Sequence, residues 1–220
     1  MDIVDEFTPE RESDLFIHPG LDTDWFIGDR AKFLSGPKFI PLRKSITKNL
    51  VRKSEELNKL VIFGGGTDSH GFANIMSQKL CGLPGYGKAI FFSNEQDYIE
   101  ELDSRFRVFP FGAALDCELS DADLVFTTAS TSSIEVVARE LPLGVACSVD
   151  NQVTYYEALS KSKVAAKIGE RVTAGEWKIH TDVIHRLISD VNFRDELKLA
   201  AHDFIDLSGA KRILDEIIAL

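Results

Sequence analysis

The stretch that decides the fold runs from Asp121 to Gln152 and reads DADLVFTTASTSSIEVVARELPLGVACSVDNQ. It begins with the apolar run Leu124–Phe126, which is typical of a strand buried in a parallel sheet. A second apolar run covers residues 143–149. Between the two runs the sequence predicts a helix over residues 134–141, which Pro142 ends. Strands that alternate with helices in this way favour an α/β fold with a parallel sheet.

The turn before the predicted helix, residues 127–133, carries six hydroxyl side chains in seven residues. A strand that enters a helix through such a turn directs free backbone N–H groups and the positive helix end at one place, where a phosphate binds. Glu135 follows, in the first turn of the predicted helix. It either forms a capping box with Ser132 or accepts hydrogen bonds from two ribose hydroxyls of a bound nucleotide.

This stretch resembles the nucleotide-binding motif in the C-terminal domain of family 28 glycosyltransferases. It resembles more closely the UDP-sugar hydrolases of pseudaminic acid biosynthesis and their spore-coat and sialic-acid-pathway relatives. The residues that carry the resemblance are Thr131-Ser132-Ser133-Ile134-Glu135, Leu141-Pro142 and Asp150-Asn151-Gln152. Two further stretches agree: Gly36-Pro37-Lys38-Phe39 with Leu42-Arg43 resembles the interdomain linker, and Ser208-Gly209-Ala210-Lys211-Arg212 resembles a C-terminal motif.

The resemblance implies a doubly wound, Rossmann-like parallel sheet that corresponds to one half of a GT-B fold. Residues 1–58 are expected to form an N-terminal arm and connector, and residues 59–220 the nucleotide-binding domain. In the hydrolases the catalytic histidine lies in a glycine-rich loop of a separate N-terminal domain. This sequence has no Gly-x-Gly-His motif. We therefore expect an enzyme that is incomplete without an N-terminal domain or partner chain.

A second strand-turn-helix unit starts at residues 60–63 and continues through Gly64-Gly65-Gly66-Thr67-Asp68. A tight turn alone would use these glycines, whereas the resemblance places Gly65, Gly66 and Asp68 beside a diphosphate or sugar. His70 follows the turn and is a candidate catalytic base or phosphate contact; the alternative is an ordinary loop histidine.

Polar or aromatic residues follow two more predicted strands. Asn151 and Gln152 either contact a ligand at the carboxyl edge of the sheet or cap the next helix. Phe111-Gly112 is either an ordinary turn or, as the resemblance implies, the segment whose backbone reads a uracil edge. The predicted nucleotide-binding residues are Gly65, Gly66, Asp68, Phe111, Gly112, Ser130, Thr131, Ser132, Ser133, Glu135, Asn151 and Gln152.

The sequence departs from its relatives at Ala129-Ser130, where they carry glycine and a phosphate can approach the backbone closely. Here either hydroxyl groups replace the backbone as donors, or the site is weakened.

The net charge of −10 argues against a nucleic-acid partner. No apolar run approaches the ~20 residues of a membrane span, and the acidic N-terminus does not resemble a signal peptide. We expect a cytoplasmic protein with no metal and no cofactor. Helices are predicted over residues 176–189, 192–204 and 210–219.

These observations predict that the chain binds UDP or a UDP-sugar. The expected reaction is hydrolysis or transfer at the anomeric carbon of a UDP-amino sugar, in the biosynthesis of a surface polysaccharide or nonulosonic acid. Two alternatives stay open. The chain is a non-catalytic nucleotide-binding or assembly module, or it is one subunit of a split glycosyltransferase.

Overall fold

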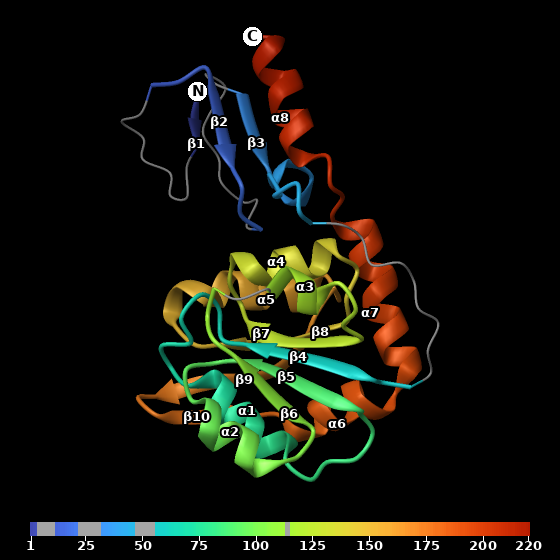
Figure 1. Ribbon diagram of the computed structural model, residues 1–220. Coiled ribbons are helices and arrows are strands. Elements are labelled where there is room, and N and C mark those ends of the chain that lie inside the picture. Colours follow the sequence, from blue (N-terminus) through green and yellow to red (C-terminus); the bar gives the residue numbers. More distant parts are fainter. Residues whose placement is uncertain (4–11, 22–31, 47–55, 113–114) are drawn as a thin grey trace.

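The protein is built around a curled seven-stranded sheet with helices on both faces (Figure 1). The computed structural model describes residues 1–3, 12–21, 32–46, 56–112 and 115–220. The strand order is β10-β9-β8-β7-β4-β5-β6, and every neighbouring pair is parallel except β9 and β10. The predicted doubly wound, Rossmann-like sheet is confirmed, with one antiparallel strand at its edge.

The elements of this sheet alternate along the chain. The strands are β4 (Lys59–Phe63), β5 (Lys88–Phe92), β6 (Phe106–Phe109), β7 (Leu124–Thr128), β8 (Leu143–Cys147), β9 (Ala166–Thr173) and β10 (Glu176–Ile179). The helices are α1 (Phe72–Leu80), α2 (Gln96–Leu102), α3 (Leu115–Leu119), α4 (Thr131–Ala138), α5 (Val153–Lys161), α6 (Thr181–Ser189), α7 (Val191–Phe204) and α8 (Gly209–Ile218), with short 3-10 turns η1 (Pro37–Phe39) and η2 (Asp150–Gln152).

The central strand β4 is apolar from Leu60 to Phe63 because both of its faces are buried. Val61 and Phe63 pack into the core on the side of α4 and α5, whereas Leu60 and Ile62 pack into the core on the side of α1 and α6. Successive side chains of a strand point to opposite faces, so a strand covered on both faces needs no polar positions. Its carboxyl end is thereby fixed between two packed layers.

A small parallel sheet lies beside the main body and is formed by β1 (Asp2–Ile3), β2 (Leu15–His18) and β3 (Lys32–Ser35). Its buried residues Leu15, Ile17 and Leu34 pack against Ile213 and Ile217 of α8, so the last helix covers the first strands (Figure 1). Helix α8 also contacts η1, and a Cβ on Gly209 would lie 2.1 Å from the carbonyl oxygen of Ile40.

Two predicted helices were placed wrongly. Helix α4 begins at Thr131 rather than residue 134, and Thr127 and Thr128 belong to strand β7. Glu135 therefore lies in the second helical turn, and Ser130 rather than Ser132 is the N-cap, so the capping box does not form. The region 176–189 divides into β10 and α6, because residues 176–179 alternate exposed and half-buried side chains with the period of a strand.

Part of the predicted connector, residues 47–55, lies outside the described residues. Among the helices that are described, none combines the length and the apolar character that crossing a lipid bilayer requires.

Candidate functional site

The candidate site lies where the strand order reverses. The chain proceeds outward from β4 to β5 and β6, returns to β7 on the other side of β4, and continues to β8 and β9. The carboxyl ends of β4 and β7 are neighbours, with Phe63 paired to Thr127. Ligands of open α/β sheets bind at such a switch point. Both the glycine turn and the hydroxyl turn predicted from sequence begin there.

The two turns touch each other. Gly65 has φ +84°, and a Cβ at this position would lie 3.5 Å from Thr128 Oγ1 and 3.9 Å from Ser130 Oγ. Thr128 is only 1% exposed, and its hydroxyl has no hydrogen-bond partner. Because buried hydroxyls in proteins are normally paired, Thr128 Oγ1 is a donor left over beside the glycine turn.

The first turn of α4 completes this region. Ser133 Oγ and the Ser133 N–H both donate to the carbonyl oxygen of Ser130, at 2.6 and 2.9 Å, and so close the turn. Ser130 makes no side-chain cap bond, Thr131 is exposed and Ser132 is half-buried. The first N–H groups of a helix lack intrahelical partners, and together with the helix dipole they favour an anion.

Asp68 shapes the glycine turn from within. It has φ +46°, and its carboxylate accepts hydrogen bonds from the N–H groups of Phe72 (2.7 Å) and Ala73 (2.9 Å) at the start of α1. A Cβ on Gly64 would lie 1.9 Å from Asp68 Oδ1, so a glycine is required there. Burial raises the pKa of Asp68 to about 6, against the opposing effect of the two N–H donors. Asp68 thus caps α1 and fixes the turn.

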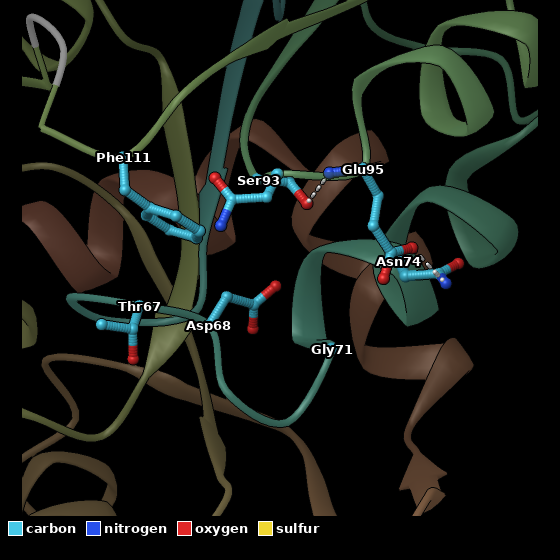
Figure 2. A pocket seen from close by; sticks show the side chains of 8 residues that line it. Thr67, Asp68, Gly71, Asn74, Ser93, Glu95 and Phe111 are labelled. Carbon is cyan, nitrogen blue, oxygen red and sulfur yellow. Dashed lines mark hydrogen bonds between the residues drawn. The ribbon is translucent and has the colours of Figure 1, made fainter.

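A pocket opens beside Asp68 (Figure 2). It encloses about 390 Å³, including space open to solvent, and the loops after β4, β5 and β6 line it. Figure 2 shows the Phe111 ring and the Asp68 carboxylate directed into this space. Asn74 donates to Glu95 at 2.8 Å, and the Glu95 N–H donates to Ser93 Oγ at 3.1 Å. The lining residues are Thr67, Asp68, Gly71, Asn74, Ser93, Asn94, Glu95 and Phe111.

Six of these lining residues were missed by the sequence-based prediction: Thr67, Gly71, Asn74, Ser93, Asn94 and Glu95. The polar run Ser93-Asn94-Glu95 directly after strand β5 was the available signal, because ligands bind at the carboxyl ends of parallel strands. Gly112 follows Phe111 at the end of the described loop, and residues 113–114 lie outside the described residues.

Glu135 is held by the connector. Arg43 donates from Nε and Nη2 to its two carboxylate oxygens, at 2.9 and 2.7 Å, and from both Nη atoms to Asp116 at 3.1 Å. The Glu135 side chain is 20% exposed and that of Arg43 is 52% exposed. The carboxylate predicted to bind ribose is therefore ordered by a residue from outside the motif.

The polar turn after β8 is closed by its own side chains. Gln152 Oε1 accepts from the N–H and the hydroxyl of Ser148, at 2.9 and 3.0 Å. Arg171 Nε of strand β9 donates to the Ser148 carbonyl oxygen at 2.8 Å, while Asn151 is exposed. Gln152 thus stabilises the loop, and Asn151 is the member of the predicted pair that faces solvent.

His70 is placed by its backbone. Its carbonyl oxygen accepts a hydrogen bond from Trp177 Nε1 at 3.2 Å, and Trp177 also packs against Phe72 with ring centroids 5.6 Å apart. The half-buried His70 does not line the pocket beside Asp68. Among the described residues, no group of three or more His, Cys, Asp or Glu side chains is arranged to hold a metal ion.

No protein-family model and no curated protein matches the sequence. Solved structures match it. MurG from Acinetobacter baumannii is 15% identical with a TM-score of 0.71, covering 94% of this chain and 66% of MurG. A glycotransferase of kitacinnamycin is 14% identical with a TM-score of 0.60, covering 92% and 55%. The glycosyltransferase SsfS6 from Streptomyces sp. SF2575, complexed with thymidine diphosphate, is 13% identical with a TM-score of 0.53, covering 94% and 53%.

At these identities the likeness shows the fold alone, that of one half of a GT-B glycosyltransferase. The chain spans no more than 66% of the length of these three proteins.

Proposed function

We propose that this chain binds a nucleotide sugar, with UDP as the nucleotide, as one half of a GT-B type glycosyltransferase or UDP-sugar hydrolase. One observation carries the proposal. The turn at Gly65 lies against the hydroxyl of Thr128 at the end of β7 and that of Ser130 at the start of α4, and Glu135 follows on α4.

The phosphates would bind at the two turns. The open backbone at Gly65, the unpaired hydroxyl of Thr128 and the first N–H groups of α4 converge there. A helix N-terminus stabilises an anion by about 0.3–1 kcal/mol, and by up to ~2 kcal/mol in a partly buried geometry. Because the chain carries a net charge of −10, binding of an anion depends on such local donors rather than on long-range attraction.

The ribose would reach Glu135. Glu135 follows Thr131 by four positions, which corresponds to about 6 Å along a helix axis. This spacing suits the distance from a phosphate to the ribose of the same nucleotide. The carboxylate oxygens accept hydrogen bonds only, as ribose hydroxyls require. The ring of Phe111 offers the base an apolar surface, and the resemblance assigns base recognition to the backbone of Phe111 and Gly112.

The reaction would be transfer or hydrolysis at the anomeric carbon of the bound sugar. In GT-B enzymes the site lies between two halves, and this chain spans 53–66% of the three glycosyltransferase structures described above. We infer that its residues bind and orient the nucleotide, while a second half provides the general base. The resemblance favours an amino sugar and a surface-polysaccharide or nonulosonic acid pathway.

Calorimetric titration tests the proposal directly. We expect UDP to bind more tightly than AMP or GMP, and also more tightly than thymidine diphosphate, whose sugar has one hydroxyl fewer for Glu135. At a UDP concentration ~100 times its Kd, the free energy of unfolding should rise by about 2.7 kcal/mol. Equal or absent binding of all four nucleotides would overturn the proposal.

A further inference from the structure

Four charged side chains, those of Glu135, Arg43, Asp116 and Arg139, are linked in series by hydrogen bonds. Arg43 binds both oxygens of Glu135 and both oxygens of Asp116. Asp116 Oδ1 also accepts from Arg139 Nη2 at 2.7 Å. Arg139 follows Glu135 by four residues, so the arrangement begins on α4 and ends at the residue that caps its C-terminus. Positive and negative groups alternate along it.

The anchor of this arrangement is buried. Arg139 is 1% exposed, and the structure commits its charge to Asp116 of α3. A buried guanidinium needs a carboxylate partner, which fixes Asp116. Asp116 in turn directs the planar guanidinium of Arg43, whose fork matches a carboxylate at two atoms. Each link therefore constrains the orientation of the next, from the buried core to the Glu135 carboxylate.

We propose that Arg43 is a positioning residue that holds the Glu135 carboxylate in the orientation needed to accept both ribose hydroxyls of a nucleotide. This inference rests on the proposed nucleotide site. Arg43 occupies one lone pair of each Glu135 oxygen and leaves the others for a ligand. Because two oxygens held in one plane match two vicinal hydroxyls, the pair selects a ribonucleotide over its 2′-deoxy analogue.

The segment that carries Arg43 is also attached to the small sheet and α8. Arg43 lies three residues beyond Ile40, whose backbone packs against Gly209 at the start of α8. The connector that carries the arginine is therefore fixed to the small sheet and α8 on one side and to Glu135 on the other.

The test compares Arg43→Ala and Arg43→Lys with the unmodified chain, using UDP, 2′-deoxy-UDP and pyrophosphate as probes. Arg186→Ala is the matched control, because Arg186 is 56% exposed, pairs with Asp190, and lies on α6, which packs on the opposite face of the sheet from α4. We expect Arg43→Ala to weaken UDP binding about 10-fold, a size typical of coupling between residues in contact. Pyrophosphate binding should stay unchanged, and 2′-deoxy-UDP should weaken by less than ~3-fold. Lysine, a point charge without the fork, should restore only part of the loss.

A structural role alone would lower the melting temperature and weaken all three probes equally, which would overturn the proposal. Unchanged UDP affinity in Arg43→Ala would also overturn it. Tighter UDP binding in Arg43→Ala would show that the arginine competes with the ribose. Each of these results requires that the unmodified chain binds UDP. A chain that binds none of the probes removes the proposed nucleotide site itself, and the positioning role with it.

Discussion

Replacing Thr128 by valine should make the protein more stable and a weaker nucleotide binder at the same time. Thr128 Oγ1 is buried, unpaired and adjacent to the turn at Gly65. A buried polar group without a partner costs ~1–3 kcal/mol, and valine has nearly the same shape. We therefore expect the free energy of unfolding to rise by about 1 kcal/mol, at the lower end of that range.

The same hydroxyl would donate to a charged phosphate oxygen in the complex. Hydrogen bonds to charged groups contribute roughly 1.5–3 kcal/mol, so UDP affinity should fall at least ~10-fold in Thr128→Val. A single substitution that raises stability and lowers affinity is difficult to explain by damage to the fold. Urea denaturation and calorimetric titration of the same preparation measure the two effects.

Thr127→Val provides the control within the same strand. Thr127 is also buried with an unpaired hydroxyl, but consecutive strand residues point to opposite faces of the sheet. The Thr127→Val variant should gain a similar free energy of unfolding and keep the UDP affinity of the unmodified chain. The reasoning is refuted if Thr128→Val binds UDP as tightly as the unmodified chain, or if the two valine variants lose affinity equally.

Three further predictions concern other residues of the site. Glu135→Ala should lower UDP affinity at least ~10-fold, since hydrogen bonds to a charged acceptor are lost, and calorimetry would contradict this if affinity held while only the melting temperature fell. The pKa of Asp68 is raised to about 6 from 3.8. Its protonated form therefore stabilises the fold fully below about pH 3.8, and this stabilisation, up to ~3 kcal/mol, is lost as the pH rises through 6. Urea denaturation from pH 4 to pH 7.5 should show the loss in the unmodified chain and not in Asp68→Asn. The chain alone should release UDP from UDP-amino sugars near the background rate, because a general base contributes ~10²–10⁴-fold; robust turnover that disappears in His70→Ala would identify a self-sufficient hydrolase.

The sequence predicted strands β4 to β8 of the sheet, but it placed a helix where β10 lies. Each strand from β4 to β8 contains at least three apolar residues and is followed within three residues by a polar or glycine residue, so the pattern can be recognised locally. The start of α4 was missed because Thr127 and Thr128 look like turn residues, whereas the neighbouring strands β4 and β8 provide backbone partners that extend β7 to Thr128. Tertiary pairing outweighed local preference.

The partner of Glu135 was beyond the reach of sequence reasoning. Arg43 lies 92 residues away along the chain, and nothing in the local pattern of either residue indicates the other. The capping box of Ser132 and Glu135 had the correct spacing, but the helix begins two residues earlier than that box requires, with Ser130 as N-cap. Similarly, Gln152 has a residue type suited to ligand binding, yet Ser148 in the same loop uses its acceptor.

The packing of α8 on the small sheet has a consequence for the order of folding. The Lys32–Glu216 ion pair spans 184 residues, and the bond from Arg212 Nη1 to the Lys38 carbonyl oxygen, at 3.0 Å, spans 174. Contacts so distant in sequence carry a high loop-closure cost and form late. The small sheet can therefore bury Leu15, Ile17 and Leu34 only after α8 has been synthesised, and we expect it to be the last part of the protein to fold.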